Sequence, residues 1–211
     1  MKAKAKAPER RTRPSADSTR ERILAAAVEL FADQGFSGAS TREIAARAGV
    51  TQPLLNYHFS SKDELWRSAV DGLFVSLTSA LLEREQGLRG VDEVTTARLL
   101  VHEFVTFSAR HPQLHRILTQ ECKADGPRME HLVEHYVRPI YETTTGRLAV
   151  LAEHGHVPDI PVEHLYYIIT GAGPTMFVLG PECRLLTNLD PTSDEVIAAH
   201  ADAVCRLIFG S

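Results

Sequence analysis

Apolar residues return every three or four positions along most of this 211-residue chain, which is the spacing of an amphipathic helix. No stretch alternates apolar and polar residues in the way that predicts a half-buried strand. Glycine and proline mark the breaks, and residues 181–191 are predicted to form a loop. From residue 61 onward the pattern predicts helices over residues 61–86, 91–109, 112–122, 127–154, 161–180 and 193–209. The fold class that follows is all-α.

The N-terminal part carries three capping boxes, in which a serine is followed three residues later by a glutamate. Gly35 is predicted to end the first helix, because glycine adopts a left-handed backbone at low cost. Each box predicts the start of a helix: Ser18 with Glu21, Ser40 with Glu43, and Ser61 with Glu64. Three helices and the start of a fourth are thus predicted to enclose one small core.

Residues 40–65, STREIAARAGVTQPLLNYHFSSKDEL, contain two short helices on either side of a glycine turn. Gly49 is predicted to end the first helix, and Thr51 is predicted to cap the second. Pro53 falls in the first turn of that second helix, where its missing N–H does no harm. This layout is that of a helix-turn-helix, whose second helix enters the major groove of DNA.

Three ordered motifs, GF, IAxxAGV and YHFxxKxxL, lie between residues 35 and 65. Together with the apolar helix from Ile23 onward, they resemble the N-terminal DNA-binding domain of the TetR family of transcriptional repressors over about 50 residues. The resemblance implies a DNA-binding domain over residues 15–62. It implies a helical ligand-binding and dimerisation domain over residues 63–211, with about nine helices in the whole chain.

Charge is distributed unevenly along the chain. Residues 1–66 hold 11 Lys and Arg against 8 Asp and Glu, whereas residues 67–211 hold 12 against 19. The net charge of −4 thus conceals a basic N-terminal module, which suits DNA, and an acidic remainder that repels the phosphate backbone. No apolar run reaches the ~18 residues of a membrane helix and no signal peptide is recognised. We therefore expect a cytoplasmic protein without membrane contact.

Residues 1–14, MKAKAKAPERRTRP, hold six basic residues and two prolines without an apolar period, so we expect a disordered basic arm. One interpretation of this arm is a solubilising tail. The other is a segment that follows the minor groove or the phosphates, as basic arms do in other helix-turn-helix proteins. Arg10, Arg11 and Arg13 lie nearest the folded domain and are the candidate contacts.

Base recognition is predicted at the start of the second helix of the motif. The amide of Gln52 can pair bidentately with an adenine edge, although a glutamine in a first turn is also an ordinary solvated residue. The two residues that follow offer apolar surface to a thymine methyl. Lys62 begins the next helix and is a candidate phosphate contact, and the resemblance implies phosphate contacts for Tyr57 and His58. The candidate DNA contacts of this module are Thr41, Arg42, Thr51, Gln52, Pro53, Leu54, Asn56, Tyr57, His58 and Lys62.

The last two predicted helices carry apolar stripes that are broader than one buried face needs. In the TetR family these two helices pair with their symmetry mates, and the twofold homodimer presents two recognition helices to a palindromic operator. Packing within one subunit is the alternative interpretation. The candidate interface residues are Leu165, Ile168, Ile169, Ala199, Ala203 and Leu207.

Aromatic residues, methionines and one leucine of the middle helices are candidates for the wall of a small-molecule effector pocket, which the resemblance implies in this part of the chain. At helical spacing such residues are also what an ordinary core contains. Pro139 and Pro174 fall inside predicted helices and are expected to kink or interrupt them. The candidate pocket residues are Phe104, Phe107, Leu118, Met129, Tyr136, Tyr141, Tyr166, Met176 and Phe177.

Two histidine pairs, His111 with His115 and His131 with His135, have the four-residue spacing that places two imidazoles on one helix face. Neither pair has a third ligand at a fixed spacing, so solvated or hydrogen-bonded histidines are favoured and no metal or cofactor is expected. The three cysteines are far apart and predict no disulfide framework. No phosphate loop, nucleophile elbow or carboxylate pair is recognised, so we expect no enzymatic activity.

The function predicted from these patterns is that of a DNA-binding transcriptional regulator, a repressor released by a small apolar or amphipathic ligand. The alternative is a DNA-binding protein that senses no ligand and acts through partner proteins or DNA architecture. An enclosed cavity of several hundred Å³ in the C-terminal domain would favour the first function, and a filled core would favour the second.

Overall fold

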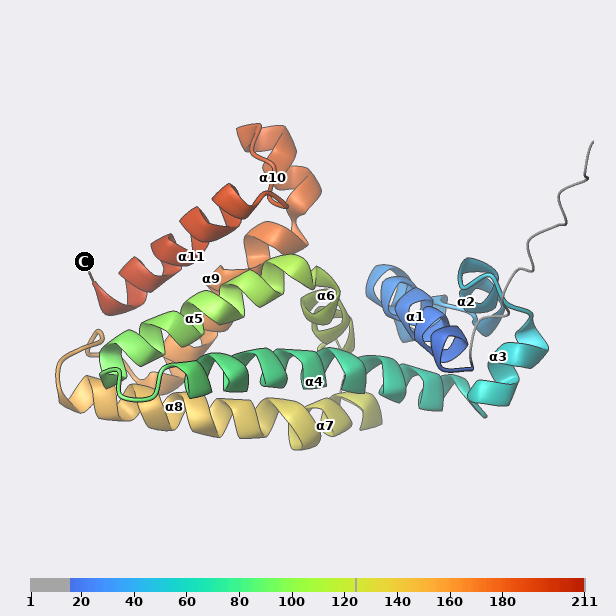
Figure 1. Ribbon diagram of the computed structural model, residues 1–211, viewed down its shortest axis with the longest axis horizontal. Helices are drawn as coiled ribbons and strands as arrows, with labels where there is room; N and C mark the ends of the chain where they lie inside the picture. Colours follow the sequence, from blue (N-terminus) through green and yellow to red (C-terminus); the bar gives the residue numbers. More distant parts are fainter. Residues whose placement is uncertain (1–15, 124, 211) are drawn as a thin grey trace, which may run out of the picture.

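The computed structural model describes residues 16–123 and 125–210, and every regular element within those ranges is helical (Figure 1). The helices of the N-terminal half are α1 (Ala16–Gly38), α2 (Thr41–Arg47), α3 (Gln52–His58), α4 (Lys62–Gly87), α5 (Glu93–Arg110) and α6 (Pro112–Glu121). The C-terminal half contains α7 (Pro127–Leu132), a π-helical segment (Val133–Val137), α8 (Arg138–Glu153), α9 (Val162–Val178), α10 (Gly180–Thr187) and α11 (Asp194–Phe209). The all-α fold class is confirmed, with more helices than the nine expected.

Helices α1, α2 and α3 gather around the N-terminal end of α4, at one end of the molecule (Figure 1). The Ser40–Glu43 capping box is present, with the Glu43 amide donating to Ser40 Oγ at 3.1 Å. Gly49 makes the turn with φ +66°, a left-handed backbone that favours glycine, and a Cβ there would lie 2.8 Å from Arg22 Nη2. Gly35 has φ +69° and breaks the helical path of α1, as predicted.

The other two predicted capping boxes differ in the structure. Ser18 lies inside α1, because the helix already runs from Ala16. Ser61 caps α4 as expected, but Glu64 turns its carboxylate to the amide of Ser60 at 2.7 Å, so the reciprocal half of the box is displaced by one residue. Thr51 precedes α3 without a side-chain cap hydrogen bond. A serine–glutamate spacing therefore located these helix starts to within a few residues without determining which amide each side chain binds.

One apolar cluster runs from the helix-turn-helix into the rest of the chain. Ile23, Phe31, Ile44 and Trp66 are at most 1% exposed, and α6 packs directly against α1. Burial of large apolar side chains is the main stabilising contribution here, about 1.5–3 kcal/mol for each fully buried one. The DNA-binding end is therefore held firmly on α4 and α6.

A second apolar cluster lies at the other end of the molecule, where α5, α9 and α11 pack together over the end of α8 (Figure 1). Helix α4 runs from the first cluster along α5, so it spans both ends of the protein. Within the described ranges, no helix has both the length and the apolar character that crossing a membrane requires.

One expectation about prolines in helices is confirmed and two are corrected. Pro139 interrupts the helix predicted over residues 127–154, because a π-helical segment, Val133–Val137, lies just before it, where the missing proline N–H and the ring disfavour regular α-helical bonding. Pro174 is buried inside α9 without interrupting it. The predicted loop begins with α10, because Pro181 stands in a first turn, where proline is compatible with a helix.

Acidification is expected to destabilise the fold through His115, whose Nε2 lies 3.0 Å from Ser108 Oγ at the contact between α5 and α6. Burial lowers the pKa of His115 from 6.5 to about 4. Between these values the unfolded chain binds a proton that the folded chain does not, so stability rises with pH across this window and is lost as the pH falls. The expected loss from this residue is about 2 kcal/mol between pH 7.5 and pH 5.

Urea unfolding at these two pH values tests this expectation. The His115→Gln variant should lose less stability on acidification than the parent protein, whereas His164→Gln, at an exposed position, should lose as much as the parent. An equal loss for the parent protein and His115→Gln would show that another group carries the pH dependence.

Candidate DNA-binding surface and ligand cavity

Helix α3 buries one apolar face in the protein and exposes its other face to solvent. Leu55 is 1% exposed and Phe59, at the helix end, is 2% exposed, so both anchor α3 in the first cluster. This anchoring leaves Gln52, Pro53, Leu54, Asn56 and Tyr57 on the outside. Tyr57 is 81% exposed, so its ring lies free on this face of α3.

The starts of α2 and α3 lie side by side. Gln52 Nε2 is 3.5 Å from Thr41 Oγ1, and Arg42 is exposed on the next position of α2. Thr41 and His58 are half-buried, and Thr51 is exposed. The structure thus brings the predicted contacts of α2 and α3 onto one surface. Arg10, Arg11 and Arg13 lie outside the described residues.

Lys62, at the start of α4, contacts an aromatic ring of its own chain. Its Nζ lies 4.6 Å from the centre of the Phe36 ring, and partial burial together with the nearby Arg128 lowers the pKa of Lys62. Arg128 stacks over the same ring at 3.9 Å and pairs with Glu121 at 2.9 Å. Arg128 is 66 residues away from Lys62 in the sequence, so no local pattern connected these two cations.

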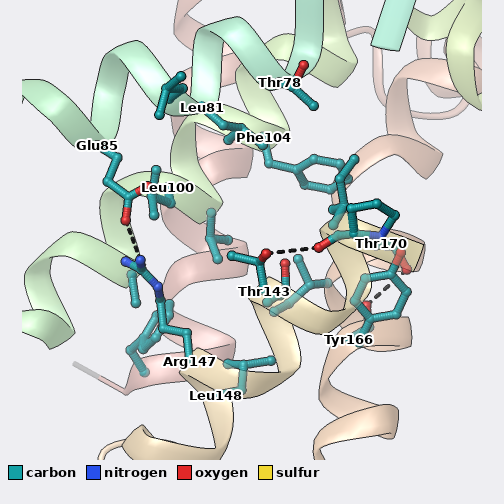
Figure 2. Close-up of a pocket in the computed structure, with 18 residues that line it drawn as sticks. Thr78, Leu81, Glu85, Leu100, Phe104, Thr143, Arg147, Leu148, Tyr166 and Thr170 are labelled. Carbon is teal, nitrogen blue, oxygen red and sulfur yellow. Dashed lines mark hydrogen bonds and ion pairs between the residues drawn. The ribbon is translucent and has the colours of Figure 1, made fainter. Parts of the chain in front are cut away.

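A cavity of about 300 Å³ lies between α4, α5, α8 and α9 (Figure 2), and Phe209 of α11 also lines it. Its wall is mostly aliphatic and aromatic, and a few polar side chains interrupt it. Such a composition is typical of a small-molecule site. The polar side chains are Thr78, Glu85, Thr143, Thr144, Arg147, Tyr166 and Thr170.

Two of the nine predicted pocket residues, Phe104 and Tyr166, line this cavity. The others lie elsewhere, because helical spacing identifies apolar residues without showing which cluster they join. Four of them belong to the first apolar cluster or pack against it: Phe107, Leu118, Met129 and Tyr136. Phe177 is buried in the second cluster. Met176 and Tyr141 lie outside the cavity wall, and the Tyr141 ring packs against the Tyr166 ring with their centres 5.0 Å apart.

Arg147 is one of the cavity residues that the sequence patterns missed. It pairs with Glu85 of α4 (Figure 2) and, through Nε, with Glu93 of α5 at 3.3 Å. These partners are 62 and 54 residues away in the sequence. A lone arginine in an amphipathic helix carries no signal of such a contact.

The predicted interface residues of the last helices divide into two groups. Leu165 and Ile169 are 0% and 4% exposed inside the second apolar cluster, and Ile168 packs against it, so they face their own subunit. Ala199, Ala203 and Leu207 of α11 are exposed, and Leu207 is 61% exposed. Leu165 and Ile169 are corrected to core, whereas Ile168, which is only partly buried, and the three residues of α11 remain a predicted interface.

The histidine pairs do not assemble a metal site within the described ranges, where no group of three or more potential ligands occurs. His111 precedes α6, and its ring packs on Phe107 at 4.4 Å. The His131 and His135 rings are 4.2 Å apart, and His131 lies beside Asp71. Burial and the nearby cations lower the pKa of His131.

The sequence model described as "Bacterial regulatory proteins, tetR family" matches residues 23–69, the segment that builds the helix-turn-helix. The chain belongs to the TetR family. It is a helix-turn-helix transcriptional regulator, and regulators of this family act on DNA as dimers.

Relatives of this TetR-family regulator include both repressors and activators. The chain is 29% identical to the transcriptional repressor NicS of Pseudomonas putida, over 73% of each protein. It is 34% identical to the transcriptional activator FasR of Mycolicibacterium smegmatis, over 54% of this chain and 51% of FasR. The crystal structure of AibR in complex with isovaleryl coenzyme A and operator DNA matches 91% of this chain and 98% of AibR, with a TM-score of 0.73 and 16% identity, which shows a shared fold.

Proposed function

We propose that this TetR-family regulator binds a palindromic operator as a homodimer in the cytoplasm, represses transcription, and leaves the DNA when a small molecule occupies the cavity. One observation carries this proposal. Helix α4 begins at Lys62 beside the DNA-binding surface, and the same helix lines the cavity with Thr78, Leu81, Leu82 and Glu85. The two sites are about 24 Å apart along one helix.

The proposed DNA-binding domain is residues 15–62, and the proposed ligand-binding and dimerisation domain is residues 63–211. Gln52 and Arg42 are the proposed base contacts, because both are exposed at the starts of α3 and α2. Tyr57, which is exposed on α3, and Lys62, at the start of α4, are proposed phosphate contacts. The presence of a cavity favours a ligand-responsive regulator over the ligand-independent alternative.

Gln52→Ala is expected to cost about 1–3 kcal/mol on the cognate operator and to relax the preference at one base pair per half-site, because a bidentate base contact is lost. Lys62→Ala is the matched comparison. It should weaken binding to all sequences alike and reduce the salt dependence by about one unit, because a phosphate contact carries no sequence information.

Operator titrations at several salt concentrations, on cognate and on random duplexes, measure both effects. If Gln52→Ala weakened binding to the two duplexes equally, the base-contact assignment would be wrong. A reporter gene under the operator, with and without the regulator, tests the direction of regulation. Lower expression without the regulator would contradict repression and indicate activation, as the name of FasR describes for that relative.

A further inference from the structure

The hydroxyls of the cavity wall fall into two groups. Thr78, Thr143 and Thr170 each donate their proton to the carbonyl oxygen four residues earlier in the same helix, at 2.9 Å in all three cases. Tyr166 and Thr144 also line the cavity, but within the described ranges their hydroxyls make no hydrogen bond. The second group therefore offers protons for which the protein supplies no acceptor.

Tyr166 is the more deeply buried of these two donors. Its side chain comes from α9 and is 7% exposed (Figure 2). Burial raises the pKa of Tyr166 to about 12, so the phenol keeps its proton at neutral pH. A buried donor without an acceptor costs free energy, and a ligand oxygen at hydrogen-bond distance would recover it.

Arg147 adds a third unpaired donor to the wall. Its Nη1 is buried and has no hydrogen-bond partner among the described residues. Its Nη2 and Nε pair with Glu85 and Glu93, whose side chains are about half exposed. Because solvent screens these two carboxylates, they do not by themselves determine the charge of a ligand.

The rest of the wall is apolar and comes from four helices and α11. Leu81, Leu100, Phe104, Ile140 and Phe209 are representative. A cavity of about 300 Å³ with such a wall suits a small molecule with an apolar body and one polar group.

We propose that the cavity binds a small, mostly apolar molecule that carries a hydrogen-bond acceptor, a carbonyl or carboxylate oxygen, and that Tyr166 and Thr144 are the donors to it. The apolar body of the ligand packs against the aliphatic and aromatic wall. This inference rests on the proposed function, in which the cavity is the effector site.

Three probes with the same skeleton, a phenyl ring and three further carbons, test the inference. Propiophenone carries a carbonyl, 3-phenylpropanoate carries a carboxylate, and propylbenzene has no acceptor. Isothermal titration of the full-length protein without DNA measures their dissociation constants. We expect at least one of the two oxygen-bearing probes to bind, and the absence of binding by both would overturn the inference.

Tyr166→Phe removes the phenol hydroxyl and keeps the ring. This variant should weaken the oxygen-bearing probe about fivefold, the effect of one hydrogen bond, and change propylbenzene less than about twofold. Tyr141→Phe is the matched control, because Tyr141 lies outside the wall with its ring centre 5.0 Å from that of Tyr166. The control should leave the affinities of all three probes unchanged.

Thr144→Val tests the second donor at nearly constant shape. Thr145→Val is its control, since Thr145 lies outside the wall and already donates to the Tyr141 carbonyl. The inference is overturned if neither Tyr166→Phe nor Thr144→Val weakens an oxygen-bearing probe more than its control does and more than it weakens propylbenzene. A loss confined to 3-phenylpropanoate would identify the acceptor as a carboxylate, and a loss for propiophenone would show that an uncharged carbonyl suffices.

Operator titration in the presence of a saturating probe separates the ligand class from the proposed function. If a probe binds through Tyr166 or Thr144 but leaves the operator complex intact, the ligand class is supported and release of DNA by cavity occupancy is contradicted. If a probe releases the operator while both variants bind it as their controls do, the ligand class is overturned and the proposed function is supported.

Discussion

Leu207→Glu is expected to convert the dimer to monomers and to lower affinity for a palindromic operator by about a hundredfold or more. Leu207 is 61% exposed on α11, while its neighbours Val204 and Ile208 are buried in their own subunit. In a dimer interface a glutamate at this position would be an unpaired buried charge. A monomer holds one half-site, so the gain from two linked half-site contacts disappears.

Sedimentation and operator titration measure this effect together. Val75→Glu is the matched control, because it places the same charge on another exposed aliphatic position, 58% exposed on α4. This control should remain dimeric and bind operator normally. Ala203→Glu should behave like Leu207→Glu, since both face outward from α11. Intact dimers for both α11 variants would place the interface on another surface.

A ligand that prefers the released conformation by about 3 kcal/mol is expected to lower operator affinity by more than about a hundredfold. The ligand achieves this only by binding more tightly to a conformation whose two recognition helices no longer match the half-site spacing. Helix α4 is the proposed lever, because one end meets the DNA-binding surface and the other carries Glu85 into the cavity wall. The ion pair of Arg147 with Glu85 links that end of α4 to α8.

The coupling between the cavity and the DNA-binding surface can be measured without knowing which residues transmit it, because the two binding equilibria affect each other equally. Operator must weaken ligand binding by the same factor by which ligand weakens operator binding. The dissociation constant of a ligand confirmed in the cavity is measured with the free dimer and with the dimer–operator complex. Equal constants for such a ligand would refute the allosteric account.

The local signals of the sequence identified the DNA-binding module well, because its helices are defined by contacts within about 50 residues. The Ser40–Glu43 box, the left-handed Gly49 and the buried Leu55 all follow from near neighbours. Amphipathic periodicity likewise identified the long helices, since each buries one face. It missed α10, where a first-turn proline resembles a break.

The sequence by itself determined the helical class, the helix-turn-helix and the family, since these depend on spacing and on ordered motifs. The tertiary structure decided which apolar residues form core and which line the cavity. Leu165 and Ile169 became core rather than interface, and Arg147 became part of the cavity through partners on two other helices. The physical reason is that an apolar stripe has the same sequence pattern whether it lies in a core, a cavity wall or an interface. Only the packing of distant segments decides which of these each side chain joins.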